Sequence, residues 1–175
     1  MRNLRKLSML LKEANNDMSK TLKKVTNRDI VDGHYTIPDG VTEIGEGAFY
    51  RCSSLKSIFI PDGVTEIGIG AFERCSSLKN ITLPEGLKKI GWGSFNDCTS
   101  LKSITIPDSV TEIGWYAFFG CTGLRSIFIP DGVTEIGWGA FNGCTGLRSI
   151  SLPKKVKMGY NVFAGCSKNL NIEYR

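Results

Sequence analysis

The sequence contains a single histidine, His34, and no long apolar run. His34 follows a turn glycine and has no nucleophile beside it in the sequence, so we expect a solvated loop histidine and not a general acid or base. Near the amino terminus, the apolar stretch that starts at Leu7 is interrupted by Ser8 and stops at Lys12. It is shorter than the roughly 7–15 apolar residues of an export signal and the about 20 of a membrane span. We therefore expect no membrane span, and either a cytoplasmic protein or a cell-surface or secreted one whose export signal has been removed.

Net positive charge is missing from most of the chain. Residues 1–29 carry eight Lys/Arg and three Asp/Glu, whereas residues 30–175 carry fourteen of each. Binding nucleic acid without sequence preference requires a positive face that displaces counterions from phosphates. The charge distribution therefore argues against a nucleic-acid partner for the body of the protein.

Six cysteines are present, but no C-x-x-C pair supplies zinc ligands. They occupy equivalent places in a repeat: Cys52, Cys75, Cys98, Cys121, Cys144 and Cys166. In stacked repeats such side chains run parallel, about 5 Å apart, which is within disulfide range but poorly oriented for a bridge. We predict buried free thiols that act as small apolar residues, with no metal site, no cofactor site and no catalytic residue.

A repeat of 23 residues dominates the sequence. Proline recurs at that interval, at Pro38, Pro61, Pro84, Pro107, Pro130 and Pro153. Aligned on proline, each unit has the pattern L-x-x-I-x-I/L-P-x-x-V/L-x-x-I-G-x-x-A/S-F-x-x-C. A period of 20–29 residues with this kind of apolar spacing is typical of leucine-rich repeats, whose units stack because one unit cannot bury its own apolar residues.

The fourth unit shows how one repeat is expected to fold. Ile104 and Ile106 are two residues apart, so on a strand both side chains point inward. Pro107 ends the strand and a turn follows. Gly114 permits a second bend. The remaining apolar residues return to the interior and close the coil with a short helical or irregular turn: Val110, Ile113, Ala117, Phe118 and Cys121.

The units resemble the BspA-like leucine-rich repeats, which share the IP-x-x-V-x-x-IG-x-x-AF-x-x-C pattern, over about residues 32–175. The resemblance implies a right-handed leucine-rich-repeat superhelix with parallel strands, an α/β solenoid leaning to β. It also implies bacterial proteins that are often surface-exposed adhesion or host-interaction factors. It brings no catalytic residues.

Both ends of the chain depart from the repeat. Apolar residues from Leu4 to Val25 recur at three- and four-residue steps, which predicts a basic amphipathic helix over residues 1–29. This helix would cap the solenoid, or alternatively bind a partner or a membrane surface. The solenoid then covers residues 30–175, with units near 32–54, 55–77, 78–100, 101–123, 124–146 and 147–168 and a terminal strand at 169–175.

One column of the repeat, directly after the Ile-Gly step, suggests a binding surface. We call it the aromatic strip: Ile69, Trp92, Trp115, Trp138 and Tyr160. A core position would be apolar in every unit, yet Glu46 opens this series, so exposure is expected. Exposed aromatic strips mark interaction sites, although rings that lie flat on the coil could instead shield it.

A second candidate surface is the outward face of the predicted strands, with Phe59 and Phe128 among small polar residues. The sequence therefore predicts a protein–protein interaction module that uses the aromatic strip or this strand face. The alternative is a carbohydrate-binding module, because aligned tryptophans also stack on sugar rings. Ice binding by the threonine column Thr42, Thr65, Thr111 and Thr134 is disfavoured, since Lys88 interrupts the column.

Overall fold

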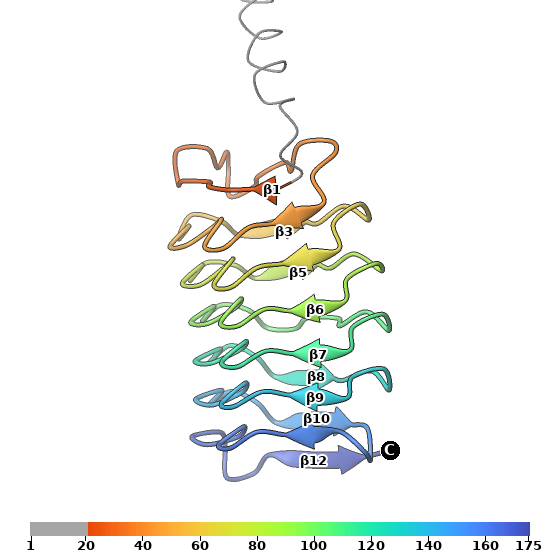
Figure 1. The fold of residues 1–175 in the computed structure, drawn as a ribbon. Helices are drawn as coiled ribbons and strands as arrows, with labels where there is room; N and C mark the ends of the chain where they lie inside the picture. The colour runs from red at the N-terminus through yellow and green to blue at the C-terminus, as the bar shows by residue number, and fades with distance from the viewer. Residues whose placement is uncertain (1–20) are drawn as a thin grey trace, which may run out of the picture.

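The computed structural model describes residues 21–175, which wind into a stack of coils with β1 at one end and the carboxyl terminus at the other (Figure 1). One strand from each coil contributes to a parallel sheet of seven strands, here called the long sheet. Its strands, in order, are β1 (Thr21–Leu22), β2 (Glu43–Ile44), β4 (Glu66–Ile67), β6 (Lys89–Ile90), β7 (Glu112–Ile113), β9 (Glu135–Ile136) and β11 (Lys157–Met158).

Across the coil, a second column of strands forms two shorter parallel sheets. β3 (Ser57–Phe59) pairs with β5 (Asn80–Thr82), and β8 (Ser126–Phe128) pairs with β10 (Ser149–Leu152), which pairs with β12 (Asn171–Tyr174). Between these sheets, residues 101–106 are not strand, although Ile104 and Ile106 stay buried as predicted. The predicted parallel-strand solenoid is confirmed.

The long sheet was not predicted, because its strands are only two residues long and are defined by bonds between coils. The threonine column extends the ladder: the Thr134 N–H donates to Thr111 O at 3.0 Å, and the Thr111 N–H donates to Lys88 O at 2.9 Å. The threonine hydroxyls also donate to the preceding coil, as Thr134 Oγ1 does to Thr111 O at 3.2 Å. The threonine column therefore joins the coils together.

The core consists of apolar columns that run the length of the stack. Phe49, Phe72, Phe95, Phe118 and Phe141 are fully buried. Neighbouring rings in this column, with Phe163 at its end, stack 4.8–5.9 Å apart. Such offset stacks add about 0.5–1.5 kcal/mol per pair to the burial of the rings. Each repeat thus stabilises its neighbours through the same ring, as expected for a repeat array.

The segment after each Ile-Gly step forms consecutive turns, and the predicted short helical turns are wrong. Its N–H groups alternate in direction: Gly47 donates to Ile69 O of the next coil at 2.9 Å, whereas Ala48 donates back to Gly45 O at 3.2 Å. A helix would direct successive N–H groups along its own axis. Here every second group joins two coils, and no helix occurs within residues 21–175. The fold is therefore β and not α/β.

The predicted helical cap over residues 1–29 is also wrong for its described part, while residues 1–20 lie outside the described residues. Residues 21–29 form β1 and a turn. Val25 occupies the place that phenylalanine has in later coils, because its carbonyl accepts a bond from Cys52 Sγ, as the Phe49 carbonyl does from Cys75 Sγ. Residues 21–29 are therefore an incomplete first coil.

At the other end, β12 pairs with β10, and Arg175 at the end of β12 contacts residues of the preceding coils. The Arg175 backbone N–H donates to Leu152 O at 2.9 Å, and its Nε donates to Ser151 Oγ at 2.7 Å. The guanidinium pairs with the Asp131 carboxylate and lies 3.9 Å from the centroid of the Phe128 ring. One side chain thus ties the last strand to two preceding coils.

Candidate partner-binding surface

The aromatic strip runs along the solenoid where the long sheet meets the turns. All five of its side chains are exposed, with 50% of Ile69, 48% of Trp92, 43% of Trp115, 43% of Trp138 and 83% of Tyr160 accessible to solvent. The expected exposure of this column is confirmed. Its use as a binding site remains a proposal.

The tryptophans contact one another along the strip. Trp92 and Trp115 stack with centroids 4.7 Å apart and planes within 3° of parallel. Trp138 is tilted by 60° from Trp115, at 6.4 Å. The indoles of Trp92 and Trp115 therefore direct faces at each other and edges at solvent.

The tryptophans also cover the glycine of the next coil. A Cβ added to Gly114 would lie 2.9 Å from Trp92 Cδ1, and one added to Gly137 would lie 2.4 Å from Trp115 Cδ1. The added Cβ of Gly114 would also lie 2.8 Å from the carbonyl carbon of Gly91. The Ile-Gly glycine is thus required by the close approach of coils, and not by the bend that the sequence suggested. Each indole shields backbone with one part of its surface and leaves nearly half exposed.

Tyr116 widens the strip, and the sequence analysis missed it. Its ring lies 6.3 Å from the Trp138 ring and 5.7 Å from the Phe119 ring. Its φ is 54°, in the left-handed region that Gly93 and Gly139 occupy at the same place in their coils. That conformation costs a bulky side chain of order 1 kcal/mol or more. The sequence does carry a sign of this exception, because four other repeats have glycine at the position of Tyr116.

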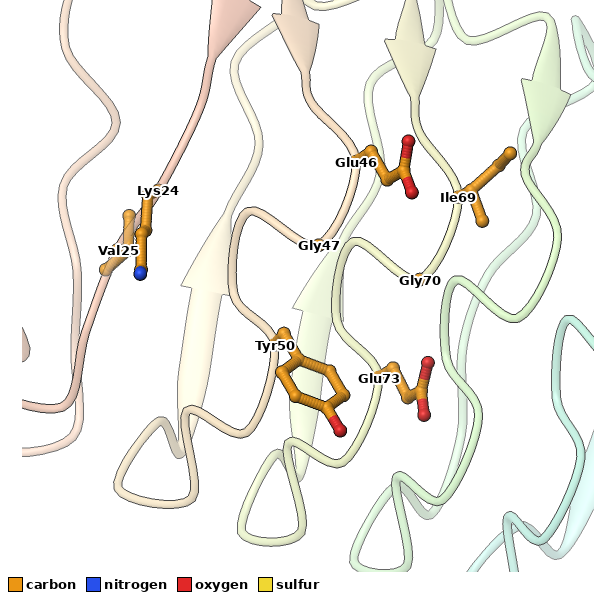
Figure 2. Close-up of a pocket in the computed structure, with 8 residues that line it drawn as sticks. All are labelled: Lys24, Val25, Glu46, Gly47, Tyr50, Ile69, Gly70 and Glu73. Atoms are coloured by element: carbon orange, nitrogen blue, oxygen red, sulfur yellow. The ribbon is translucent and has the colours of Figure 1, made fainter.

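A groove opens at the first coils of the strip (Figure 2). It has a volume of about 590 Å³ and is lined by Lys24, Val25, Glu46, Gly47, Tyr50, Ile69, Gly70 and Glu73. Gly47 lies between Glu46 and Tyr50 on one coil, and Gly70 lies between Ile69 and Glu73 on the next. The incomplete first coil borders the groove with Lys24 and Val25. The groove is therefore a continuation of the strip, in which Glu46 occupies the column of the indoles and Glu73 lies on the neighbouring turn.

The strand face carries the other two predicted binding residues, Phe59 and Phe128, with 63% and 53% of their side chains exposed. The structure separates them from the aromatic strip, because the two strand columns lie across the coil from each other (Figure 1). The Arg175 guanidinium covers part of the Phe128 ring. Phe59 lines a hollow of about 360 Å³ near the start of the solenoid.

His34 has a serine beside it that the sequence did not reveal. Its Nδ1 lies 2.8 Å from Ser57 Oγ, since the two residues are 23 apart and occupy neighbouring coils. None of the described residues that line the hollow around them is acidic, so it supplies no carboxylate to orient the histidine as in a catalytic triad. The pair is therefore a hydrogen bond between adjacent coils on an exposed face.

The cysteines are free, and all except Cys166 are buried. Desolvation raises the pKa of Cys52 to about 11 and that of Cys144 to about 12, and it raises the pKa of Cys121 well above the usual value. These thiols stay protonated and donate to carbonyl groups, as Cys121 Sγ does to Phe95 O at 3.1 Å. Among the described residues there is no group of three or more His, Cys, Asp or Glu able to hold a metal ion. Nor does this part of the chain contain a helix long and apolar enough to cross a membrane.

The repeat pattern, the stacked coils and the cysteine column agree with one family. Six copies of the BspA type leucine-rich repeat region match residues 42–171. The chain belongs to the BspA-type leucine-rich repeat family. No curated protein matches the sequence significantly.

Solved bacterial structures extend the family assignment. A leucine-rich cell surface protein from Faecalibacterium prausnitzii is 42% identical, with a TM-score of 0.66 over 68% of this chain and 31% of that protein. The leucine-rich repeat protein of Treponema pallidum is 34% identical, with a TM-score of 0.66 over 74% of this chain and 69% of that one. A leucine-rich repeat protein from Bacteroides ovatus is 33% identical, with a TM-score of 0.57 over 81% of this chain and 43% of that protein. The chain thus spans about a third of the length of the Faecalibacterium protein.

Proposed function

We propose that this chain is a protein-interaction module of a bacterial cell-surface protein, and that it binds its partner through the aromatic strip. The observation that carries the proposal is the continuous row of half-exposed indoles from Trp92 to Trp138. Exposed aromatic rows are unfavourable in water unless a partner covers them, and Trp and Tyr dominate interface hot spots. The surface location is suggested by the Faecalibacterium relative, which is described as a cell surface protein.

Binding to protein fits the ring geometry better than binding to carbohydrate. A sugar stacks on the open face of an aromatic ring, whereas the faces of Trp92 and Trp115 are turned toward each other. The exposed parts of the rings suit a protein surface that supplies apolar groups. Tyr160, which is 83% exposed, keeps the carbohydrate alternative open for the last coil.

The proposal is tested by affinity capture from lysates of cells that meet the protein, with the unmodified chain and a Trp92→Ala, Trp115→Ala, Trp138→Ala variant as baits. A Phe59→Ala, Phe128→Ala variant is the matched control for the strand face. We expect the triple variant to lose specific partners and the control to retain them. Partners lost only with the control variant would place the site on the strand face, and binding to a glycan array would favour the alternative.

Circular dichroism verifies that each variant is folded. A Trp115→Glu variant provides a second test if the alanine variant unfolds. Glu46 occupies the same column in the second coil, and the N–H groups of its two neighbours bond to adjacent coils in the same way as those of Gly114 and Tyr116. A folded Trp115→Glu protein that keeps every partner would contradict the proposal.

A further inference from the structure

The charges beside the aromatic strip indicate the kind of partner that it fits. Resting on the function proposed above, we propose that the strip and the neighbouring long sheet together bind a basic segment of a partner protein. In this arrangement, partner Lys or Arg side chains pair with glutamates of the long sheet, while its apolar side chains contact the indoles.

The outward positions of the long sheet are mostly acidic. From β2 to β11 they read Glu43, Glu66, Lys89, Glu112, Glu135 and Lys157. The parallel register places Glu43 opposite Glu66, and Glu112 opposite Glu135. Like charges directly opposite each other destabilise a sheet, so a cation bound over either pair would relieve repulsion.

The chain's own cations neutralise only part of this row. Lys89 Nζ lies 2.7 Å from the Glu112 carboxylate. Thr21 Oγ1 donates to Glu43 at 2.7 Å. Lys89 lies opposite Glu66 and Lys157 lies opposite Glu135 in the sheet, and Lys89 interacts electrostatically with both glutamates. Among the described residues, however, neither glutamate forms an ion pair, and both side chains are exposed. Both carboxylates can therefore still accept a cation from a partner.

Acidic residues extend beyond the sheet on the same side of the coil. The turns that precede β2, β4, β6, β7 and β9 carry Asp39, Asp62, Glu85, Asp108 and Asp131, whereas the turn before β11 carries Lys154 and Lys155. The regular basic column instead precedes the strands on the other side of the coil: Lys56, Lys79, Lys102, Arg125 and Arg148. Acidic residues thus outnumber basic ones on the side of the aromatic strip, where the basic residues include Lys88, Lys89, Lys154, Lys155 and Lys157.

Two coils carry a carboxylate and an indole three residues apart, Glu112 with Trp115 and Glu135 with Trp138. Glu135 and Trp138 are separated by two buried residues, Ile136 and Gly137, and both are exposed. Arginine suits this combination, because its guanidinium pairs with a carboxylate while its plane packs against an aromatic ring. Glu66 and Glu135 are three coils apart, about 14 Å at strand spacing, which an extended peptide spans with about four residues.

The test begins with displayed random 12-residue peptides selected on the full chain and counter-selected on a Trp115→Ala variant. We expect the strip-dependent peptides to be enriched in Lys and Arg together with aromatic or large apolar residues. Enrichment of neutral or acidic peptides would overturn the proposal, as would the absence of any peptide that depends on Trp115.

Matched charge variants then separate specific pairing from general attraction. Glu66→Gln with Glu135→Gln should weaken the binding of an enriched peptide by about three- to tenfold at low salt. Asp62→Asn with Asp108→Asn removes the same charge from the turns and should change the affinity by less than about twofold. Equal effects of the two variants, or an affinity that does not fall as NaCl is raised, would contradict the role of the glutamates.

Two other occupants of the strip are distinguishable outcomes. If sedimentation velocity shows a dimer of this chain that dissociates in the Trp115→Ala variant, the strip binds a second copy and the proposal is overturned.

If peptides bind more tightly after Arg2, Arg5 and Lys6 are replaced by Gln, the strip is assigned to the chain's own basic amino-terminal segment, which would overturn the proposal of a partner protein. If the triple tryptophan variant loses its protein partners but Glu66→Gln with Glu135→Gln binds them unchanged, the proposed function is supported and the proposal of a basic partner segment is overturned.

Discussion

The indole of Trp92 lies parallel to the indole of Trp115 in the next coil, with centroids 4.7 Å apart and planes within 3°. The same Trp92 ring covers Gly114, on which an added Cβ would lie 2.9 Å from Trp92 Cδ1. The rings of Trp92 and Trp115 are therefore each held by the coil that follows them. A binding surface built in this way loses little side-chain entropy when a partner covers it.

The glycine beneath each indole is predicted to be irreplaceable. Gly114→Ala should lower the free energy of unfolding by about 2 kcal/mol or more, because its Cβ would lie within 3 Å of backbone atoms of the preceding coil. Gly86→Ala is the matched control, since its Cβ would have nothing nearer than 3.5 Å. Urea denaturation of the two variants measures the difference, and equal stabilities would show that the coils can separate locally.

Tyr116 should matter more for binding than for stability. Tyr116→Asn relieves the left-handed strain, as Asn161 does at the same place in its coil, but it removes the ring contacts with Trp138 and Phe119. These effects oppose each other, so the free energy of unfolding should change by less than about 1 kcal/mol. Affinity for the partner of the strip should fall several-fold. A large loss of stability in thermal or urea denaturation would instead make Tyr116 a structural residue.

The phenylalanine column should dominate stability. Phe95→Ala removes a fully buried ring that stacks on Phe72 and Phe118, at an expected cost of about 3–5 kcal/mol. Phe59→Ala, on the exposed strand face, should cost less than about 1 kcal/mol. Denaturation curves with equal midpoints for these two variants would be incompatible with the stacked core.

The buried thiols make stability depend on pH in the alkaline range. Burial raises the pKa of Cys52 to about 11 and that of Cys144 to about 12, from a reference value of 9.0. Below pH 9 the thiols are protonated in both the folded and the unfolded states, so this contribution is fully present there. Above pH 9 the unfolded state releases protons first, and stability falls by up to about 1.4 kcal/mol per pH unit for each buried thiol.

Urea denaturation under reducing conditions, at several values between pH 7 and pH 11, measures this fall. In Cys144→Ala the free energy of unfolding should fall less steeply with pH, because one buried thiol no longer contributes. Reaction with a thiol reagent at neutral pH should modify Cys166 first, because it is the one cysteine in the column that is not fully buried. Rapid modification of all six in the folded protein would contradict the closed column.

The repeat could be predicted because its apolar positions recur at one spacing and each is buried in coil after coil. The long sheet could not, because Glu112 and Ile113 have no strand signal of their own and pair only when the coils stack. Leu22 and Val25 fit a helical face by their spacing, yet Leu22 belongs to a strand and Val25 to the irregular segment that follows it. The exposure of the tryptophans followed from Glu46 in their column. The stacking of their rings and the strain at Tyr116 depend on neighbouring coils, which no single repeat specifies.

The column of the aromatic strip contains Glu46, Ile69, Trp92 and Tyr160 in coils whose hydrogen bonds are otherwise alike. The segments 57–72 and 126–141 differ only in having Ile69 or Trp138 at this place. A mutation in the column therefore alters what the molecule presents to its surroundings while the backbone beneath is preserved. Natural selection can change this surface one coil at a time, and a designer could randomise the five positions of the aromatic strip to obtain new binders on an unchanged scaffold.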